Sequence, residues 1–159
     1  MTMTIDGREA VHAFVEHEHA ELTGGIARIH ELACELPNRP ASELLVDVGD
    51  VLRWIDETLR PHMAWEEAWL FPQIDAQAHT PWATRLVRFD HRQIARQAER
   101  LSSHRLDARH GPGHAAAAEL RSDLLALEAL VRANVEREEE FLLPLLESAG
   151  DRWTAEWRD

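Results

Sequence analysis

Two stretches of the sequence carry side chains that can bind a cation, and they share one pattern. Residues 62–72 read HMAWEEAWLFP, and residues 134–144 read NVEREEEFLLP. Each has Glu at its fifth and sixth positions and Pro at its eleventh. His62 and Glu66 are four residues apart, which makes them neighbours on one face of a helix. An imidazole nitrogen beside a carboxylate oxygen suits iron, manganese or zinc better than calcium or magnesium.

The same shift of 72 residues relates a second pair of segments, EHAEL and DHRQI, and aligns His19 with His91. His62 follows His19 by 43 residues, and Asn134 follows His91 by the same interval. The chain is therefore predicted to contain two copies of one helical hairpin. Such a repeat gives a pseudo-two-fold axis through the core, across which equivalent residues face each other.

The elements that position these residues are all predicted to be helices, because the hydrophobic periodicity is helical throughout and no segment is typical of a strand. Asp6 and Glu9 form a capping-box start for the first helix. Pro and Gly residues at 37–40 and 110–113 indicate loops. The first predicted helix ends before residue 37. The next three cover about 42–74, 80–103 and 114–147, and a short terminal helix is predicted at 151–157.

Four long helices with short connections predict an all-α fold, an up-down-up-down antiparallel four-helix bundle. A length of 159 residues fits a single domain spanning 1–159, with its bundle core at about 8–147 and a short C-terminal segment at 148–159. Pro61 is expected to kink the second helix and Pro72 to end or bend it, because proline removes a backbone donor and crowds the preceding turn.

The polar residues of the two repeated stretches lie on the apolar faces of their helices. The inward stripe of the second helix is Val48, Leu52, Ile55, Leu59, His62, Glu66, Trp69 and Leu70. The inward stripe of the fourth helix is Leu120, Leu124, Leu127, Val131, Asn134, Glu138, Phe141 and Leu142. No Lys or Arg on these stripes can neutralise a buried carboxylate, which is costly to leave unpaired. The second Glu of each pair, Glu67 and Glu139, is placed on the flank of its helix.

With His19 and His91 on the apolar faces of the first and third helices, this set resembles the hemerythrin-like, HHE cation-binding family. The resemblance covers roughly residues 10–147 and matches the family pattern at His19, His62, Glu66, His91 and Glu138. It implies a non-haem di-iron centre in which Glu66 and Glu138 bridge the ions. His19 and His62 would serve one ion and His91 the other. Zinc and manganese remain alternative metals.

Two positions depart from that pattern. Asn134 stands where the family has the histidine of the fourth helix, and Ala95 stands where classical oxygen carriers have a second histidine on the third. The expected centre is therefore asymmetric, with one site weak or empty and with coordination positions open to a small molecule.

The expected function is that of a hemerythrin-like iron protein that binds, senses or reacts with O2, peroxide or nitric oxide. One alternative is a peroxidase- or catalase-like redox enzyme, so whether the chain is an enzyme stays open. Another is a metal-poor bundle that acts as an interaction or regulatory module. A ferritin-like centre is disfavoured, because Glu-x-x-His occurs only in the first helix.

Two further residues of the first helix have simpler interpretations. His17 is the rival of His19 for the position on the first helix, although it points away from that face. Cys34 is interpreted as a small apolar filler near the end of the same helix.

Composition limits the partners and the compartment. The chain has 29 acidic and 17 basic residues, a formal charge of −12, which disfavours nucleic acids and anionic membrane surfaces. Its single cysteine excludes an intrachain disulfide, and no segment reads as a secretory signal or a membrane span. These features predict a cytoplasmic protein.

Overall fold

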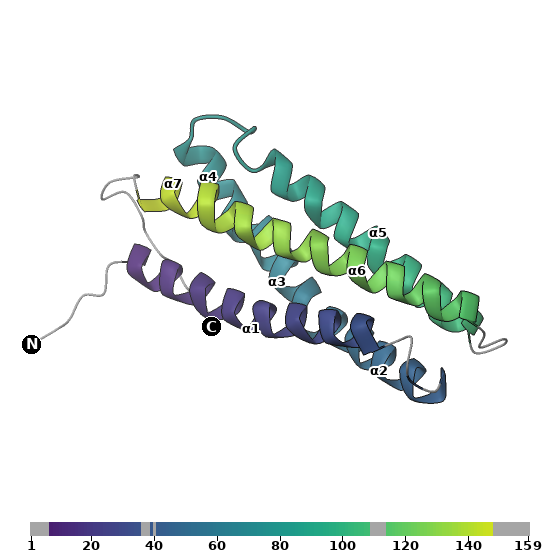
Figure 1. Cartoon of the computed structure of the whole chain (residues 1–159). Coiled ribbons are helices and arrows are strands. Elements are labelled where there is room, and N and C mark those ends of the chain that lie inside the picture. The colour runs from purple at the N-terminus through teal and green to yellow at the C-terminus, as the bar shows by residue number, and fades with distance from the viewer. Residues whose placement is uncertain (1–6, 36–38, 40, 109–113, 148–159) are drawn as a thin grey trace, which may run out of the picture.

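The structure, a computed structural model, describes residues 7–35, 39, 41–108 and 114–147. Every regular element in these ranges is a helix, and four long helical segments run alongside one another (Figure 1). The first and third segments are single helices, α1 (Gly7–Glu35) and α5 (Arg85–Ala108). The second segment is made of α2 (Ala41–Trp54), η2 (Ile55–Leu59), α3 (Arg60–Trp65), η3 (Glu66–Leu70) and α4 (Phe71–Gln77). The fourth is made of α6 (His114–Arg137), η4 (Glu138–Leu142) and α7 (Leu143–Glu147).

The prediction of an all-α four-helix bundle is confirmed. Helix α1 contacts α2 and α6, and α5 contacts the same two helices, so the four segments surround a common core. The predicted capping residue Asp6 and the terminal segment 151–157 lie outside the described residues. No helix of the described part is both long and apolar enough to cross a bilayer.

The turn between the second and third segments is longer than the sequence predicts. The second segment reaches Gln77, and α5 begins at Arg85 rather than at residue 80. The carboxylate of Asp75 accepts hydrogen bonds from both the backbone N–H and the hydroxyl of buried Thr84, at 3.1 and 3.0 Å. These bonds tie the residue before α5 back to α4. His79 turns the chain with a positive φ of 52°.

Three π-helical turns, η2, η3 and η4, allow the helices to continue through prolines. Each turn ends two residues before a proline: Pro61, Pro72 and Pro144. The residue after each turn donates its N–H five residues back, namely Arg60 to Ile55, Phe71 to Glu66 and Leu143 to Glu138. In an α-helix, a proline ring clashes with the carbonyl four residues earlier. Here that carbonyl lies within the wider π turn. The second segment accordingly continues through Pro72 instead of ending there.

Each wide turn also changes which residues face the core after it. The predicted stripes placed Trp69 and Phe141 inward, but Trp69 is only half-buried and Phe141 is 63% exposed. Leu70 and Leu142, which the stripes also placed inward, are buried as predicted, and Phe71 and Leu143 are buried beside them. The reason is geometric, because one additional residue per turn rotates every later side chain around the helix axis.

The apolar core is divided into two clusters along the bundle axis. The larger cluster extends from Leu32 and Leu44 to Met63 and Val135. The smaller lies around Phe71 at the other end of the bundle, where α4 and α7 pack. The polar residues singled out in the sequence belong to neither cluster, and they come from helical positions between the two.

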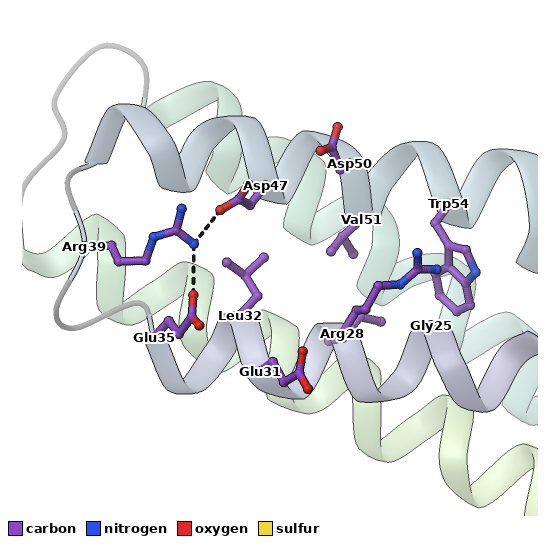
Figure 2. A pocket seen from close by; sticks show the side chains of 11 residues that line it. Gly25, Arg28, Glu31, Leu32, Glu35, Arg39, Asp47, Asp50, Val51 and Trp54 are labelled. Carbon is purple, nitrogen blue, oxygen red and sulfur yellow. Dashed lines mark hydrogen bonds and ion pairs between the residues drawn. The ribbon is translucent and has the colours of Figure 1, made fainter.

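A groove with a volume of about 310 Å³ opens between α1 and α2 (Figure 2). Gly25 permits the indole of Trp54 to lie against α1, since a Cβ there would stand 2.1 Å from the ring. Arg39 bridges Glu35 and Asp47 at 2.9 and 2.7 Å. None of the residues that line the groove belongs to the predicted metal site.

Cys34 is exposed, so the prediction that it fills the core is wrong. The neighbouring residues Leu32 and Ala33 take the inward positions of α1 instead. The Cys34 sulfur lies 3.6 Å from Nε2 of His30, whose Nδ1 lies 2.9 Å from a carboxylate oxygen of Glu128 on α6.

Candidate metal centre

The structure brings the five predicted site residues together in the middle of the bundle, with Asn134 beside them. Each long segment contributes: His19 from α1, His62 and Glu66 from the second segment, His91 from α5, and Asn134 and Glu138 from the fourth. All six side chains are buried. Glu66 and Glu138 are the first residues of η3 and η4, so the two wide turns begin at the two inward carboxylates.

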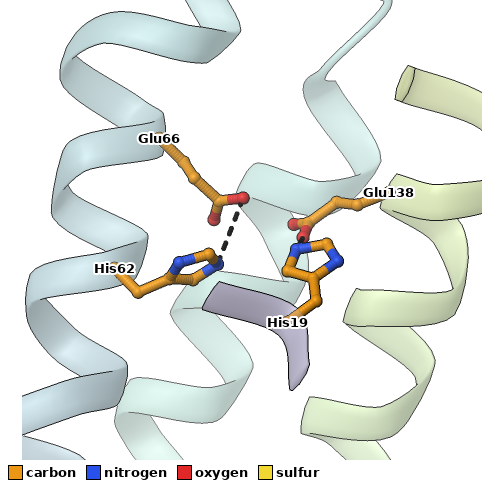
Figure 3. Close-up of side chains that lie close together, drawn as sticks. All are labelled: His19, His62, Glu66 and Glu138. Carbon is orange, nitrogen blue, oxygen red and sulfur yellow. Dashed lines mark ion pairs between the residues drawn. The ribbon is translucent and has the colours of Figure 1, made fainter. Parts of the chain in front are cut away.

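Four of these residues form a compact group that could hold one cation. His19, His62, Glu66 and Glu138 each offer a ligand atom, and these atoms all lie within 4.8 Å of one another (Figure 3). Nε2 of His19 is 3.2 Å from Oε2 of Glu138, and Nε2 of His62 is 3.3 Å from Oε1 of Glu66.

His91 lies against the remaining oxygens of both carboxylates. Its Nε2 is 3.3 Å from Oε2 of Glu66 and 3.6 Å from Oε1 of Glu138. Each carboxylate thus presents one oxygen to the compact group and the other to His91. This arrangement suits carboxylates that bridge two cations.

Asn134 occupies the fourth-helix position equivalent to His62. Its Nδ2 donates a hydrogen bond to Oε1 of Glu138 at 2.6 Å, the same oxygen that His91 approaches. In the first hairpin the corresponding contact joins His62 and Glu66. This contact of the first hairpin thus recurs in the second, with an amide in place of the imidazole.

The outward nitrogens of the histidines face carboxylates at the surface. Nδ1 of His19 lies 3.1 Å from Oε1 of Glu139, and Nδ1 of His91 lies 3.0 Å from Oε1 of Glu67. Nδ1 of His62 is 3.6 Å from Glu18, outside hydrogen-bond distance. The predicted stripes placed Glu67 and Glu139 on the flanks of their helices, and the structure shows each of them against a histidine of another helix. The Glu-Glu repeat was the signal that pointed to them.

The donor atoms fit a metal ion. In the part of the chain that the structure describes, every buried side-chain nitrogen or oxygen without a hydrogen-bond partner belongs to one of these six residues. They include Nε2 of all three histidines, both oxygens of Glu66 and Oδ1 of Asn134. An unsatisfied buried polar atom costs about 1–3 kcal/mol. Imidazole and carboxylate donors gathered around one point remove that cost by binding a cation.

Without a metal, the pKa values of Glu66, His91 and His19 are shifted by their neighbours in the centre. Burial alone would raise the pKa of Glu66, but the nearby imidazoles of His62 and His91 lower it to about 2. Burial opposes protonation of His91, yet Glu138 and Glu66 raise its pKa to about 10. The pKa of His19 is raised, against burial, mainly by Glu138.

The rival histidine of the first helix lies outside the site. His17 is exposed and lies 3.9 Å from Glu21 on the same helix. Its outward position leaves His19 as the histidine of α1 that faces the carboxylates. Ala95, one turn after His91, is half-buried and brings no donor to the centre.

Neither the curated proteins nor the solved structures gave a match to this chain. Residues 10–146, however, match the family described as the hemerythrin HHE cation binding domain. That match covers most of the chain, including all four helical segments and every residue of the centre. The buried histidine–carboxylate group and the repeated hairpins agree with it, and the chain belongs to the hemerythrin HHE cation-binding family.

Proposed function

We propose that this protein binds non-haem iron at His19, His62, Glu66, His91 and Glu138 and that the iron centre binds or senses O2, peroxide or nitric oxide. The observation that carries the proposal is the concentration of unpartnered buried donor atoms at one point of the bundle. A cation-binding family supports metal as the occupant. Mixed imidazole and carboxylate donors favour iron, with zinc or manganese as competitors.

The two halves of the centre differ in donor strength. One half has His19 and His62 with an oxygen from each bridging carboxylate. The other half has His91, the remaining carboxylate oxygens and the amide of Asn134. An amide oxygen is a weaker ligand for iron than an imidazole, so the second ion is held less tightly and keeps positions open for a small ligand. Iron bound there would supply redox and Lewis-acid chemistry.

Binding and sensing are favoured over turnover by what surrounds the centre. Apart from the predicted ligands, the buried titratable groups in the described residues are Asp90 and Asp123. Asp90 pairs with Arg137, and Asp123 pairs with Arg100 and His104. Neither is an unengaged proton donor of the kind that a peroxidase or catalase requires. We place the protein in the cytoplasm, where its exposed Cys34 stays reduced.

Metal analysis of protein purified from iron-supplemented cells tests the proposal. We expect at least stoichiometric iron in the wild-type protein and a large loss of iron in a His62→Ala, Glu66→Ala variant. Addition of nitric oxide to the ferrous protein should change its visible absorption. Protein that folds but binds neither iron nor another transition metal would overturn the proposal. Rapid catalytic peroxide consumption would instead favour the redox-enzyme alternative.

A further inference from the structure

Glu67 and Glu139 make equivalent contacts with two histidines of the candidate centre. The Glu139 carboxylate lies against Nδ1 of His19, and the Glu67 carboxylate lies against Nδ1 of His91. The two rings are buried, whereas the side chains of Glu139 and Glu67 are 52% and 44% exposed. Each hydrogen bond therefore joins a buried ring to the protein surface.

These two contacts are related by the internal repeat. A shift of 72 residues converts His19 into His91 and Glu67 into Glu139. Each contact also crosses between the hairpins, because a Glu of one hairpin holds the histidine of the other. Two independent copies of one contact, with distances of 3.1 and 3.0 Å, indicate an arrangement that the architecture produces twice.

The hydrogen bonds determine which nitrogen of each ring faces inward. A carboxylate is only an acceptor, so it keeps a proton on Nδ1 and fixes the plane of the imidazole. Nε2 then points at Glu138 from His19 and at Glu66 from His91, 3.2 and 3.3 Å away. A metal binds a histidine through the nitrogen that carries no proton, and an outer carboxylate on the other nitrogen orients the ring and strengthens its basicity.

We infer that Glu67 and Glu139 are positioning residues for the transition metal, holding His91 and His19 with Nε2 towards the centre. The inference rests on the proposed metal-binding function. The consecutive pairs Glu66-Glu67 and Glu138-Glu139 thus divide two tasks, since the first Glu of each pair faces the metal position and the second holds a histidine from outside.

Metal affinity measured on the full-length protein tests this division. Wild type and the variants Glu67→Ala, Glu139→Ala, Glu67→Gln and Glu139→Gln are titrated with Co²⁺ and Zn²⁺ in competition with a chelator. The Ala variants should raise the Kd by about 10–100-fold. The Gln variants, which keep an acceptor oxygen, should raise it less. The matched control is Glu140→Ala, a change at an exposed Glu of the same π turn, which should leave the Kd unchanged.

A second measurement separates positioning from a general loss of structure. In nitrogen-15 NMR spectra of the zinc-loaded protein, the Nδ1–H protons of His19 and His91 should exchange slowly with water. Glu139→Ala should remove that protection at His19 and leave His91 protected, and Glu67→Ala should do the reverse. A structural role would affect both rings together.

The outcomes distinguish this inference from the proposed function. If the wild type binds metal while both Ala variants keep its Kd and both protected Nδ1–H signals, the positioning role is overturned and metal binding stands. If the folded wild type binds no transition metal, both are overturned. If the Ala variants unfold, the Gln variants decide by the same two measurements, and wild-type Kd and intact protection in them would also reject the role.

Discussion

At the scale of single residues, Asn134 makes the centre asymmetric. It stands at the position equivalent to His62, but its amide donates to Glu138 where His62 offers a nitrogen to Glu66. Its Oδ1 is buried without a partner. Asp90 is the repeat equivalent of Glu18, so it is the carboxylate that would face the outer nitrogen of an imidazole at position 134. Asp90 already pairs with Arg137.

Replacing Asn134 with His should therefore increase binding at the second metal position, and freeing Asp90 should increase it further. We expect Asn134→His to raise the Co²⁺ or Fe²⁺ stoichiometry towards two per chain. The double variant Asn134→His, Arg137→Gln should bind the second ion more tightly still, because Asp90 can then accept from the new imidazole. Arg137→Gln alone is the control. Unchanged stoichiometry in both histidine variants would refute this account of position 134.

The titration of His91 and Glu66 predicts how pH affects the metal-free protein. The pKa of His91 is raised from 6.5 to about 10, so its stabilising contribution is complete below pH 6.5 and is lost as the pH rises towards 10. The pKa of Glu66 is lowered from 4.5 to about 2, so its contribution is complete above pH 4.5 and is lost as the pH falls towards 2.

Urea unfolding in the presence of a chelator should therefore give the highest stability between pH 4.5 and 6.5. The free energy of unfolding should fall from pH 6.5 to 9, and a His91→Asn variant should lose most of that fall. A stability that increases over this range in the wild type but not in the variant would contradict the expected sign.

At the scale of elements, the π turns adapt the helices to the prolines and set the faces of the helices that follow. The turns η3 and η4 start at the buried carboxylates Glu66 and Glu138, and each ends two residues before a proline, Pro72 or Pro144. The helix after each turn is rotated relative to the heptad-like stripe that the sequence suggests. Phe141 is exposed for this reason, and Leu142 is 3% exposed.

A pair of neighbouring substitutions tests this rotation. Leu142→Ala should lower the free energy of unfolding by about 2–5 kcal/mol, because it leaves a cavity in the smaller core cluster. Phe141→Ala, a larger truncation one residue earlier, should change it by less than about 0.5 kcal/mol. Chemical denaturation of the metal-free protein measures both. A loss from Phe141→Ala as large as that from Leu142→Ala would contradict the rotation, because both residues face the core in the regular helical stripe.

At the scale of the whole molecule, the centre connects all four helical segments between two apolar clusters. Its candidate ligands come from α1, α3, η3, α5 and η4, and helices on either side pack into separate parts of the core. A bound metal would tie these segments together, since the folded state brings the donors together and the unfolded chain does not.

Metal should consequently raise the stability of the whole bundle. At a free metal concentration a thousand times its Kd, the free energy of unfolding should increase by about 4 kcal/mol. Thermal unfolding with and without Zn²⁺ measures the shift, and the His62→Ala, Glu66→Ala variant serves as the control without a site. Equal shifts in wild type and control would show that zinc acts elsewhere on the protein.

Helical periodicity in the sequence was sufficient to predict the four-helix bundle, and the repeat predicted its paired hairpins. The inward positions of His62, Glu66 and Glu138 also followed from the sequence, because they continue apolar stripes at helical spacing. Where the prediction failed, the cause was local geometry that spacing alone does not encode. The π turns rotated Trp69 and Phe141 away from the core. The Asp75–Thr84 hydrogen bonds hold the residue before α5 against α4, and α5 begins at Arg85 rather than at residue 80.

Sequence alone thus determined the helices, their order and the residue types that face the core, since these depend on neighbours along the chain. Only the tertiary structure decided which atoms meet across helices. His91 lies against the carboxylates of Glu66 and Glu138. Glu67 and Glu139 each contact the outer nitrogen of a histidine from the other hairpin. Asp90 pairs with Arg137. These contacts join residues from different helices, so they depend on how far and at what rotation the helices pack, which no local spacing specifies.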